Sequence, residues 1–233
     1  MIDSYVCLDL ETTGLDPKRD KIIEIGAIKV KSGEIIAQME TFVNPQRKLE
    51  ERIVELTGIR DEHLENAPEI TDILPELIDF IGEDILLGHS VLFDYSFIKK
   101  AAINQRFKFE KFGIDTLKIA RKFLPDLESR SLAFLCSHFE IEHSAHRALT
   151  DAKATSKLYH KLAEHFYDGH EDDFKPKLLS YNAKRDTPVT IPQKEQLYKL
   201  LDRHKIKVEY NVEKLTRSEA SRIIAQILAE YGR

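Results

Sequence analysis

Cysteine is scarce in this chain: Cys7 and Cys136 are the only two among 233 residues. Neither has a neighbour at metal-ligand spacing, which argues against a cysteine-based metal site. A secreted protein of this size usually carries more cysteines, paired in disulfides. We therefore expect a protein of the reducing cytoplasm.

Long apolar runs and low-complexity tracts are missing as well. No segment approaches the roughly 20 apolar residues that a membrane-spanning helix needs, so we expect no membrane association. The sequence opens directly on a strand pattern, and we expect no signal peptide. With 42% hydrophobic residues the chain can form a real core. Its length fits one ordinary domain with a small additional one.

Charge is unevenly distributed along the chain. The overall net charge is −5, but residues 1–183 carry −9 and residues 184–233 carry +4. An acidic body with a basic end is compatible with a metal-dependent nuclease that holds its polyanion partly through an appendage. It is equally compatible with a requirement for solubility alone.

The hydrophobic patterns predict strands first and then alternating strands and helices. Alternating apolar residues predict strands over 6–11, 21–30 and 34–43, the last two joined by a turn at Gly33 as part of an antiparallel meander. Short strands follow at 84–89 and 112–116. Helical spacing predicts helices over 49–57, 70–82, 93–107, 116–123, 131–139 and 148–166, with Pro75 near a first turn. This order predicts an α/β fold with a mixed sheet covered by helices.

The C-terminal part differs from the rest. We expect a first domain over residues 1–167, a linker over 168–188 that is polar and lacks periodicity, and a small, mostly helical module over 189–233. Thr216 and Glu219 predict a capping box at the start of the last helix. Because the module is too short for a large core of its own, we expect it to dock on the main domain or on a partner.

Two acids interrupt the first strand, in the stretch VCLDLETTGLDP. Asp9 and Glu11 are two residues apart, so their side chains share one face of the strand, roughly 7 Å apart. Such carboxylates repel each other unless a cation lies between them. Oxygen ligands of this kind suit Mg²⁺ or Mn²⁺. Taken alone, the pair also fits an exposed strand face.

Further acids occur in two later stretches. Asp94 follows a Gly-His element at the start of a helix, and His146 precedes Asp151 by five residues. Five helical steps turn a residue by about 140°, so the histidine must lie on the loop if both are to face one site. Each residue alone has an ordinary explanation, such as Asp94 stabilising a helix N-terminus. Their joint order in one chain indicates a single site.

These stretches carry a resemblance to a known family. LDLETTGLDP, GHSVLFDYSFI and HRALTDAKAT resemble the three motifs of the DEDDh 3′–5′ exonucleases, which belong to the ribonuclease-H-like superfamily. That family includes the proofreading subunit of bacterial DNA polymerase III and the exonuclease domain of the Gram-positive replicative polymerase. The resemblance covers residues 3–166 and implies a ribonuclease-H-like fold. Ser90 stands where the family more usually has Asn.

The resemblance also implies roles for individual residues. It makes His146 the general base, and it implies that two divalent ions, Mg²⁺ or Mn²⁺, are held by Asp9, Glu11, Asp94 and Asp151. Four carboxylates and two such ions balance in charge. It assigns contacts with the terminal nucleotide to Thr12, Gly14, Leu15, His89 and Phe97.

Some of these residues have alternatives. Leu15 can wedge against a base, whereas Phe97 either stacks on a base or packs in the core. Arg147 either contacts a phosphate or is solvated. Asp115 fits a helix cap as well as a ligand, and we do not count it among the ligands.

The expected activity is removal of nucleoside 5′-monophosphates from 3′ ends of nucleic acid, with DNA as the expected substrate in proofreading or repair. One alternative is an exoribonuclease, because nothing in the motifs recognises the 2′-hydroxyl group. Another is a non-catalytic nucleic-acid-binding module, which we disfavour because all five catalytic positions are occupied. The expected partners are single-stranded or 3′-end nucleic acid, and a DNA polymerase or a second copy of the chain bound through the C-terminal module.

Overall fold

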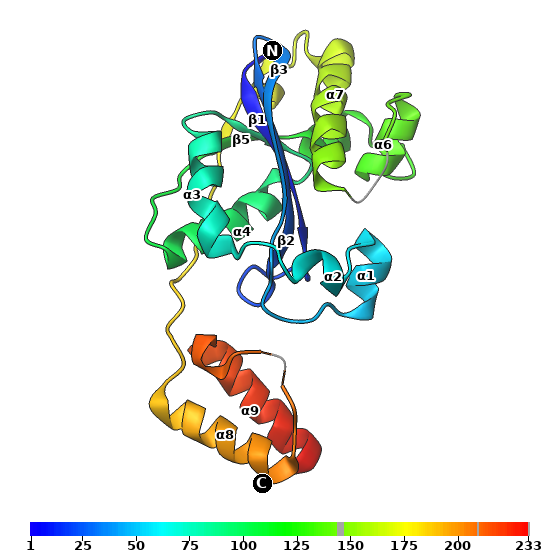
Figure 1. Cartoon of the computed structure of the whole chain (residues 1–233). Helices are drawn as coiled ribbons and strands as arrows, with labels where there is room; N and C mark the ends of the chain where they lie inside the picture. Colours follow the sequence, from blue (N-terminus) through cyan, green and yellow to red (C-terminus); the bar gives the residue numbers. More distant parts are fainter. Residues whose placement is uncertain (144–146, 209, 233) are drawn as a thin grey trace. The chain divides into compact units, whose positions relative to one another are not determined.

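The computed structural model of the chain describes residues 1–143, 147–208 and 210–232. The chain forms two compact units. The first comprises residues 1–45 and 49–183, and the second comprises residues 46–48 and 184–233 (Figure 1).

A mixed sheet of six strands lies at the centre of the first unit, in the order β3-β2-β1-β4-β5-β6. The strands are β1 (Tyr5–Thr12), β2 (Ile22–Lys31), β3 (Glu34–Phe42), β4 (Leu86–Gly88), β5 (Phe112–Asp115) and β6 (Lys177–Leu178). The first three are antiparallel, β4 and β5 run parallel to β1, and β6 is antiparallel to β5. The predicted meander with added parallel strands is confirmed.

Helices cover both faces of the sheet, because β1 is apolar on both sides. Its even-numbered residues, such as Leu8, pack in a core with α3 (Ile70–Ile81) and α4 (Val91–Asn104). Its odd-numbered residues, such as Cys7, pack in a second core. That core is formed with α5 (Thr116–Phe123), α6 (Leu132–His138) and α7 (Ala148–Phe166). Figure 1 shows α3 and α4 on one side of the sheet and α6 and α7 on the other. Among the described residues, no helix combines the length and apolarity needed to cross a membrane.

Two short helices, α1 (Glu51–Thr57) and α2 (Asp61–Leu64), follow the meander. Together with Ile59, which lies between them, they bury Ile53 and Leu64 against Ile23 of β2 in a small separate core. In α3 the structure differs from the prediction at Pro75, which lies inside the helix and not in its first turn. The proline removes one hydrogen bond from the helix interior, and the helix nevertheless buries Leu74, Leu77 and Ile81.

The segment expected to be a linker contains structure that belongs to the first unit. A 3₁₀ helix, η1 (Glu171–Phe174), buries Phe174 against Tyr159 and Phe123. The two residues of β6 then pair with β5. Elements this short are invisible to periodicity, and the first unit extends to Ala183.

The second unit has a small core of its own between α8 (Ile191–His204) and α9 (Arg217–Tyr231). Its buried residues are Leu197, Leu200, Leu201, Val212, Ile224 and Ile227, with Val212 in the 3₁₀ helix η2 (Val212–Lys214). The predicted capping box is confirmed: Thr216 Oγ1 accepts from the Glu219 N–H at 3.2 Å, and Glu219 Oε2 accepts from the Thr216 N–H at 2.9 Å.

Candidate active site

The two acids of β1 lie on the face of the sheet that α7 covers. Tyr5 and Cys7 precede them on that face and pack in the core formed with α7, as the period of two requires. In the antiparallel register with β2, Asp9 lies opposite Gly26 and Glu11 lies opposite Glu24. The strand itself therefore places both carboxylates beside β2 and below α7.

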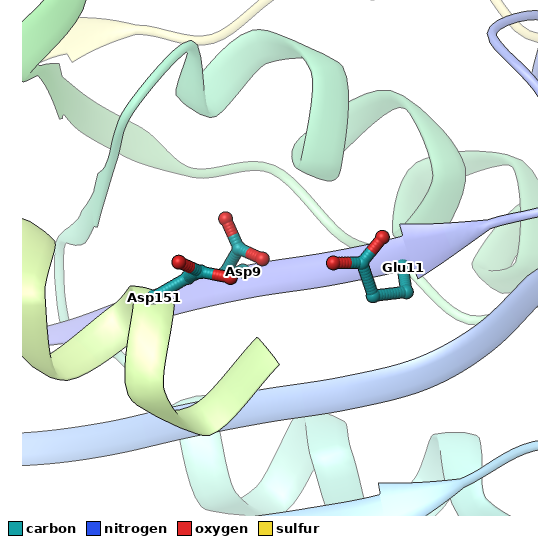
Figure 2. A group of neighbouring side chains, drawn as sticks. All are labelled: Asp9, Glu11 and Asp151. Atoms are coloured by element: carbon teal, nitrogen blue, oxygen red, sulfur yellow. The ribbon is translucent and has the colours of Figure 1, made fainter. Parts of the chain in front are cut away.

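Asp151 joins these two residues from the first turns of α7. One carboxylate oxygen from each of Asp9, Glu11 and Asp151 can be chosen so that all three lie within 4.8 Å of one another. Figure 2 shows Asp151 reaching from α7 toward Asp9 and Glu11 on β1. Hard divalent cations take oxygen ligands in clusters of this kind, so the donor set fits such an ion.

Asp94 approaches the same end of β1 from α4. It is 3% exposed, and its Oδ1 accepts a hydrogen bond from the Leu10 N–H at 3.1 Å. The turn before α4 places it there: Ser90 has a φ of 77°, in the left-handed region. Asn tolerates that region better than most residues. Asp94 is not part of the group of three within 4.8 Å.

Burial and mutual repulsion disfavour ionisation of these acids. Burial, with the neighbouring Asp94 and Asp151, raises the pKa of Asp9 well above its ordinary value. Burial also raises the pKa of Asp94. Burial, with Asp151 and Glu24, raises the pKa of Glu11 to about 7. A bound cation would reverse this effect, because an opposite charge nearby favours the ionised form.

The predicted general base, His146, lies outside the described residues. On either side of it the structure shows two contacts of Asp151. Its Oδ2 accepts from the Arg147 N–H at 3.1 Å, and its Oδ1 contacts His143 Nε2. Sequence reasoning did not single out His143, and its only signal was its place ahead of the third motif. His143 and His146 both belong to the segment that leads into α7.

The predicted nucleotide contacts after β1 lie in a loop next to the acids. The hydroxyl group of Thr12 donates to the Gly14 carbonyl at 2.7 Å, which shapes the loop. A Cβ on Gly14 would lie 2.5 Å from the Asp20 carboxylate, so a larger residue there would require the Asp20 side chain to move. Leu15 is 84% exposed. An apolar side chain this exposed beside a carboxylate cluster is available to contact a ligand.

His89 and Phe97 are already engaged within the fold. The ring nitrogens of His89 contact Thr116 Oγ1 at 2.9 Å and the Arg130 carbonyl at 2.8 Å. Phe97 is 3% exposed and packs on Phe93 with ring centroids 5.0 Å apart. For Phe97 the core-packing alternative therefore describes the structure, and no face is free for a base.

Asp115 acts as a helix cap, as the sequence suggested. Its Oδ1 accepts from the Leu117 N–H at 3.1 Å at the start of α5. It also accepts from the Ser90 N–H at 3.0 Å, which ties the end of β5 to the turn before α4. The cap thus supports the turn that positions Asp94.

Comparison with protein families agrees with this geometry. A family model described as Exonuclease matches residues 6–159, a span that contains all of the clustered acids. The chain belongs to the exonuclease family. It is therefore an exonuclease, as the three motifs predicted, and its carboxylate cluster is of the kind with which this family generally holds divalent metal ions.

The chain is also similar to parts of much longer proteins. It is 38% identical over 231 residues to the DNA polymerase III PolC-type of Oceanobacillus iheyensis, and 36% identical over 232 residues to that of Bacillus subtilis. Each alignment covers 93% of this chain and only 16% of the relative.

Solved structures share the fold. E. coli Exonuclease I in complex with a dT13 oligonucleotide has a TM-score of 0.65 at 20% identity, covering 73% of this chain and 43% of that one. The nuclease domain of 3′hExo, a DEDDh family member bound to rAMP, has a TM-score of 0.61 at 20% identity. That match covers 75% of this chain and 96% of the other. The predicted ribonuclease-H-like fold is confirmed.

Proposed function

We propose that the chain removes nucleoside 5′-monophosphates from the 3′ ends of DNA, in proofreading. The observation that carries this proposal is the meeting of Asp9, Glu11 and Asp151 within 4.8 Å, with Asp94 beside them. The substrate and the process are supported by the relatives named DNA polymerase III PolC-type, which align over 93% of the chain.

In this proposal the four acids hold two divalent cations, Mg²⁺ or Mn²⁺. When bound, such ions acidify the attacking water and stabilise the charge on the phosphate and on the leaving 3′-oxygen. The residues of the chain do the rest. His146 accepts the proton of the attacking water, because histidine is the side chain whose unperturbed pKa lies near neutrality. The exposed side chain of Leu15 contacts the terminal base, and the backbone at Thr12 and Gly14 approaches the phosphate or 3′-hydroxyl group of the strand end.

The test uses DNA single strands labelled at the 3′-terminal nucleotide, with Mg²⁺ or Mn²⁺ and with EDTA as the control. The label should leave as a nucleoside 5′-monophosphate in the presence of the metal and stay on the strand in EDTA. Asp79→Asn, on the exposed surface of α3, is the matched control for Asp9→Asn. Only the Asp9 substitution should abolish release.

Two outcomes would contradict the proposal. Release of a 5′ label ahead of the 3′ label would show digestion from the 5′ end. Full activity of Asp9→Asn would show that Asp9 is not part of the active site. A parallel RNA strand decides the substrate: faster degradation of RNA than of DNA would identify an exoribonuclease.

A further inference from the structure

Glu24 of β2 is a buried carboxylate that none of the motifs explains. It is 0% exposed, and its Oε2 accepts a hydrogen bond from the Ala148 N–H at 3.2 Å. Its Oε1 lies 2.7 Å from Arg147 Nη2. Burial raises the pKa of Glu24, whereas the Ala148 N–H and Arg147 oppose that rise. Burying a carboxylate is costly, so this position points to a use beyond packing.

Both partners of Glu24 belong to the start of α7. Arg147 is the N-cap residue of the helix and Ala148 is its first residue. The Arg147 guanidinium also lies 5.0 Å from the Phe42 ring centroid and 3.8 Å from Glu40, which is 47% exposed. The arginine side chain is 40% exposed and also keeps these contacts within the fold. It fixes the first turn of α7 to β2 and β3.

Gly26, two residues further along β2, makes room for the same turn. A Cβ built on Gly26 would lie 2.0 Å from the Ala148 carbonyl carbon and 2.0 Å from the Leu149 nitrogen. No side chain can be accommodated at that distance without moving the helix backbone. Glycine is needed here because the helix backbone lies directly on the strand.

The two positions coincide with the catalytic acids in the sheet register. Gly26 is the cross-strand partner of Asp9, and Glu24 is the cross-strand partner of Glu11. The start of α7 therefore rests on β2 beside the residues that Asp151 must meet. A displacement of this first turn would move Asp151 directly, because the Asp151 N–H donates to the Arg147 carbonyl at 2.9 Å.

We propose that Glu24 and Gly26 are positioning residues for the exonuclease reaction. They hold the first turn of α7 on β2, and through it they set the distance from Asp151 to Asp9 and Glu11. This inference rests on the proposed function. Neither residue touches the substrate, so both act through Ala148 and Arg147.

The test compares Gly26→Ala and Glu24→Gln with two matched controls in the full chain. Gly113→Ala inserts a methyl group into the same sheet at β5, against the Leu179 side chain at 2.8 Å. Glu40→Gln removes the more exposed acid beside Arg147. The readouts are kcat and KM on a DNA single strand, Mn²⁺ binding by calorimetry, and hydrogen exchange of the amides at the start of α7.

We expect Gly26→Ala to lower kcat by about 10²-fold with little change in KM, the usual effect of misplacing a catalytic group by about 1 Å. Glu24→Gln should weaken Mn²⁺ binding by roughly 10–100-fold, as loss of an outer partner of a metal site does. Both should speed exchange of the Ala148 amide. The two controls should leave all three readouts at wild-type values.

The outcomes separate this inference from the proposed function. A wild-type protein that neither binds Mn²⁺ nor digests DNA would overturn the function itself. If the wild type is active and Glu24→Gln keeps its kcat, its Mn²⁺ affinity and the protection of the Ala148 amide from hydrogen exchange, the positioning role alone is overturned. If Gly26→Ala does not fold, Glu24→Gln decides, because glutamine keeps the side-chain volume and removes the charge that pairs with Arg147.

Discussion

Replacing Glu11 with Gln should stabilise the metal-free protein and at the same time abolish its activity. The pKa of Glu11 is raised from 4.5 to about 7 by burial and by its acidic neighbours. A carboxyl group whose pKa is raised by folding contributes stability that is fully present at a pH below its pKa in the unfolded chain. This stability is lost as the pH rises through its pKa in the folded state. The stability of the metal-free wild type should therefore fall between about pH 4.5 and pH 7.

The size of the effect follows from the same shift. Each pKa unit corresponds to about 1.36 kcal/mol, so ionised Glu11 costs about 3 kcal/mol in the folded state relative to the unfolded chain. Glutamine cannot ionise, and it removes this cost. In EDTA at about pH 8, the Glu11→Gln variant should exceed the wild type by up to about 3 kcal/mol in its free energy of unfolding. At about pH 4 the two should be close.

Urea unfolding in EDTA, followed by circular dichroism, measures the free energy of unfolding of both proteins at each pH. Glu34→Gln, at the exposed start of β3, is the control and should behave as the wild type. Addition of Mn²⁺ should then stabilise the wild type much more than Glu11→Gln, because a ligand stabilises only the state that binds it. The reasoning is refuted if Glu11→Gln is no more stable than the wild type at the higher pH.

Three further results are expected. Asp9→Ala and Asp151→Ala should each abolish digestion of a labelled DNA strand, and activity close to wild type in either would contradict the site. His146→Ala should lower kcat by roughly 10²–10⁴-fold. Calorimetry should still detect Mn²⁺ in that variant, whereas loss of the metal would make His146 a ligand and not a base. Deletion of residues 184–233, which carry a net +4, should weaken DNA binding and flatten its salt dependence. An unchanged salt slope in a filter-binding titration would show that this unit does not contact DNA.

The parts of the site that depend on local geometry could be predicted from the sequence. The shared face of Asp9 and Glu11 follows from the period of two alone. The bounds of α7, residues 148–166, follow from its apolar spacing, and they put Asp151 in the early part of the helix. The convergence of β1, α4 and α7 on one site could not be predicted from local patterns. It depended on the order of three motifs and on their family resemblance, because no local pattern states which strands are neighbours.

The residues that hold the site together escaped prediction for the same reason. Glu24 and Gly26 read as ordinary members of an apolar strand. Their partners lie in a helix that begins more than a hundred residues later, and the Glu24–Ala148 hydrogen bond spans 124 positions. His143 carried no spacing signal toward Asp151. The pairing of β6 with β5 involves two residues, too few for any periodicity.

The acids cannot relax away from one another, and this accounts for the affinity for cations that we propose. Asp9 and Glu11 lie on a strand paired on one side with β2, and β4 pairs with its first half on the other side. Asp94 is tied to the Leu10 N–H, and Asp151 is tied to the Arg147 N–H. The repulsion between the carboxylates therefore persists in the folded state, where, together with burial, it raises the pKa values of Asp9 and Glu11. On mobile loops the same four groups would separate until their repulsion vanished, and a cation would have to gather them again. Held by the sheet and by α7, they bind the cation without that cost. Changes that loosen the contact between the first turn of α7 and β2 should therefore also weaken the affinity for the metal.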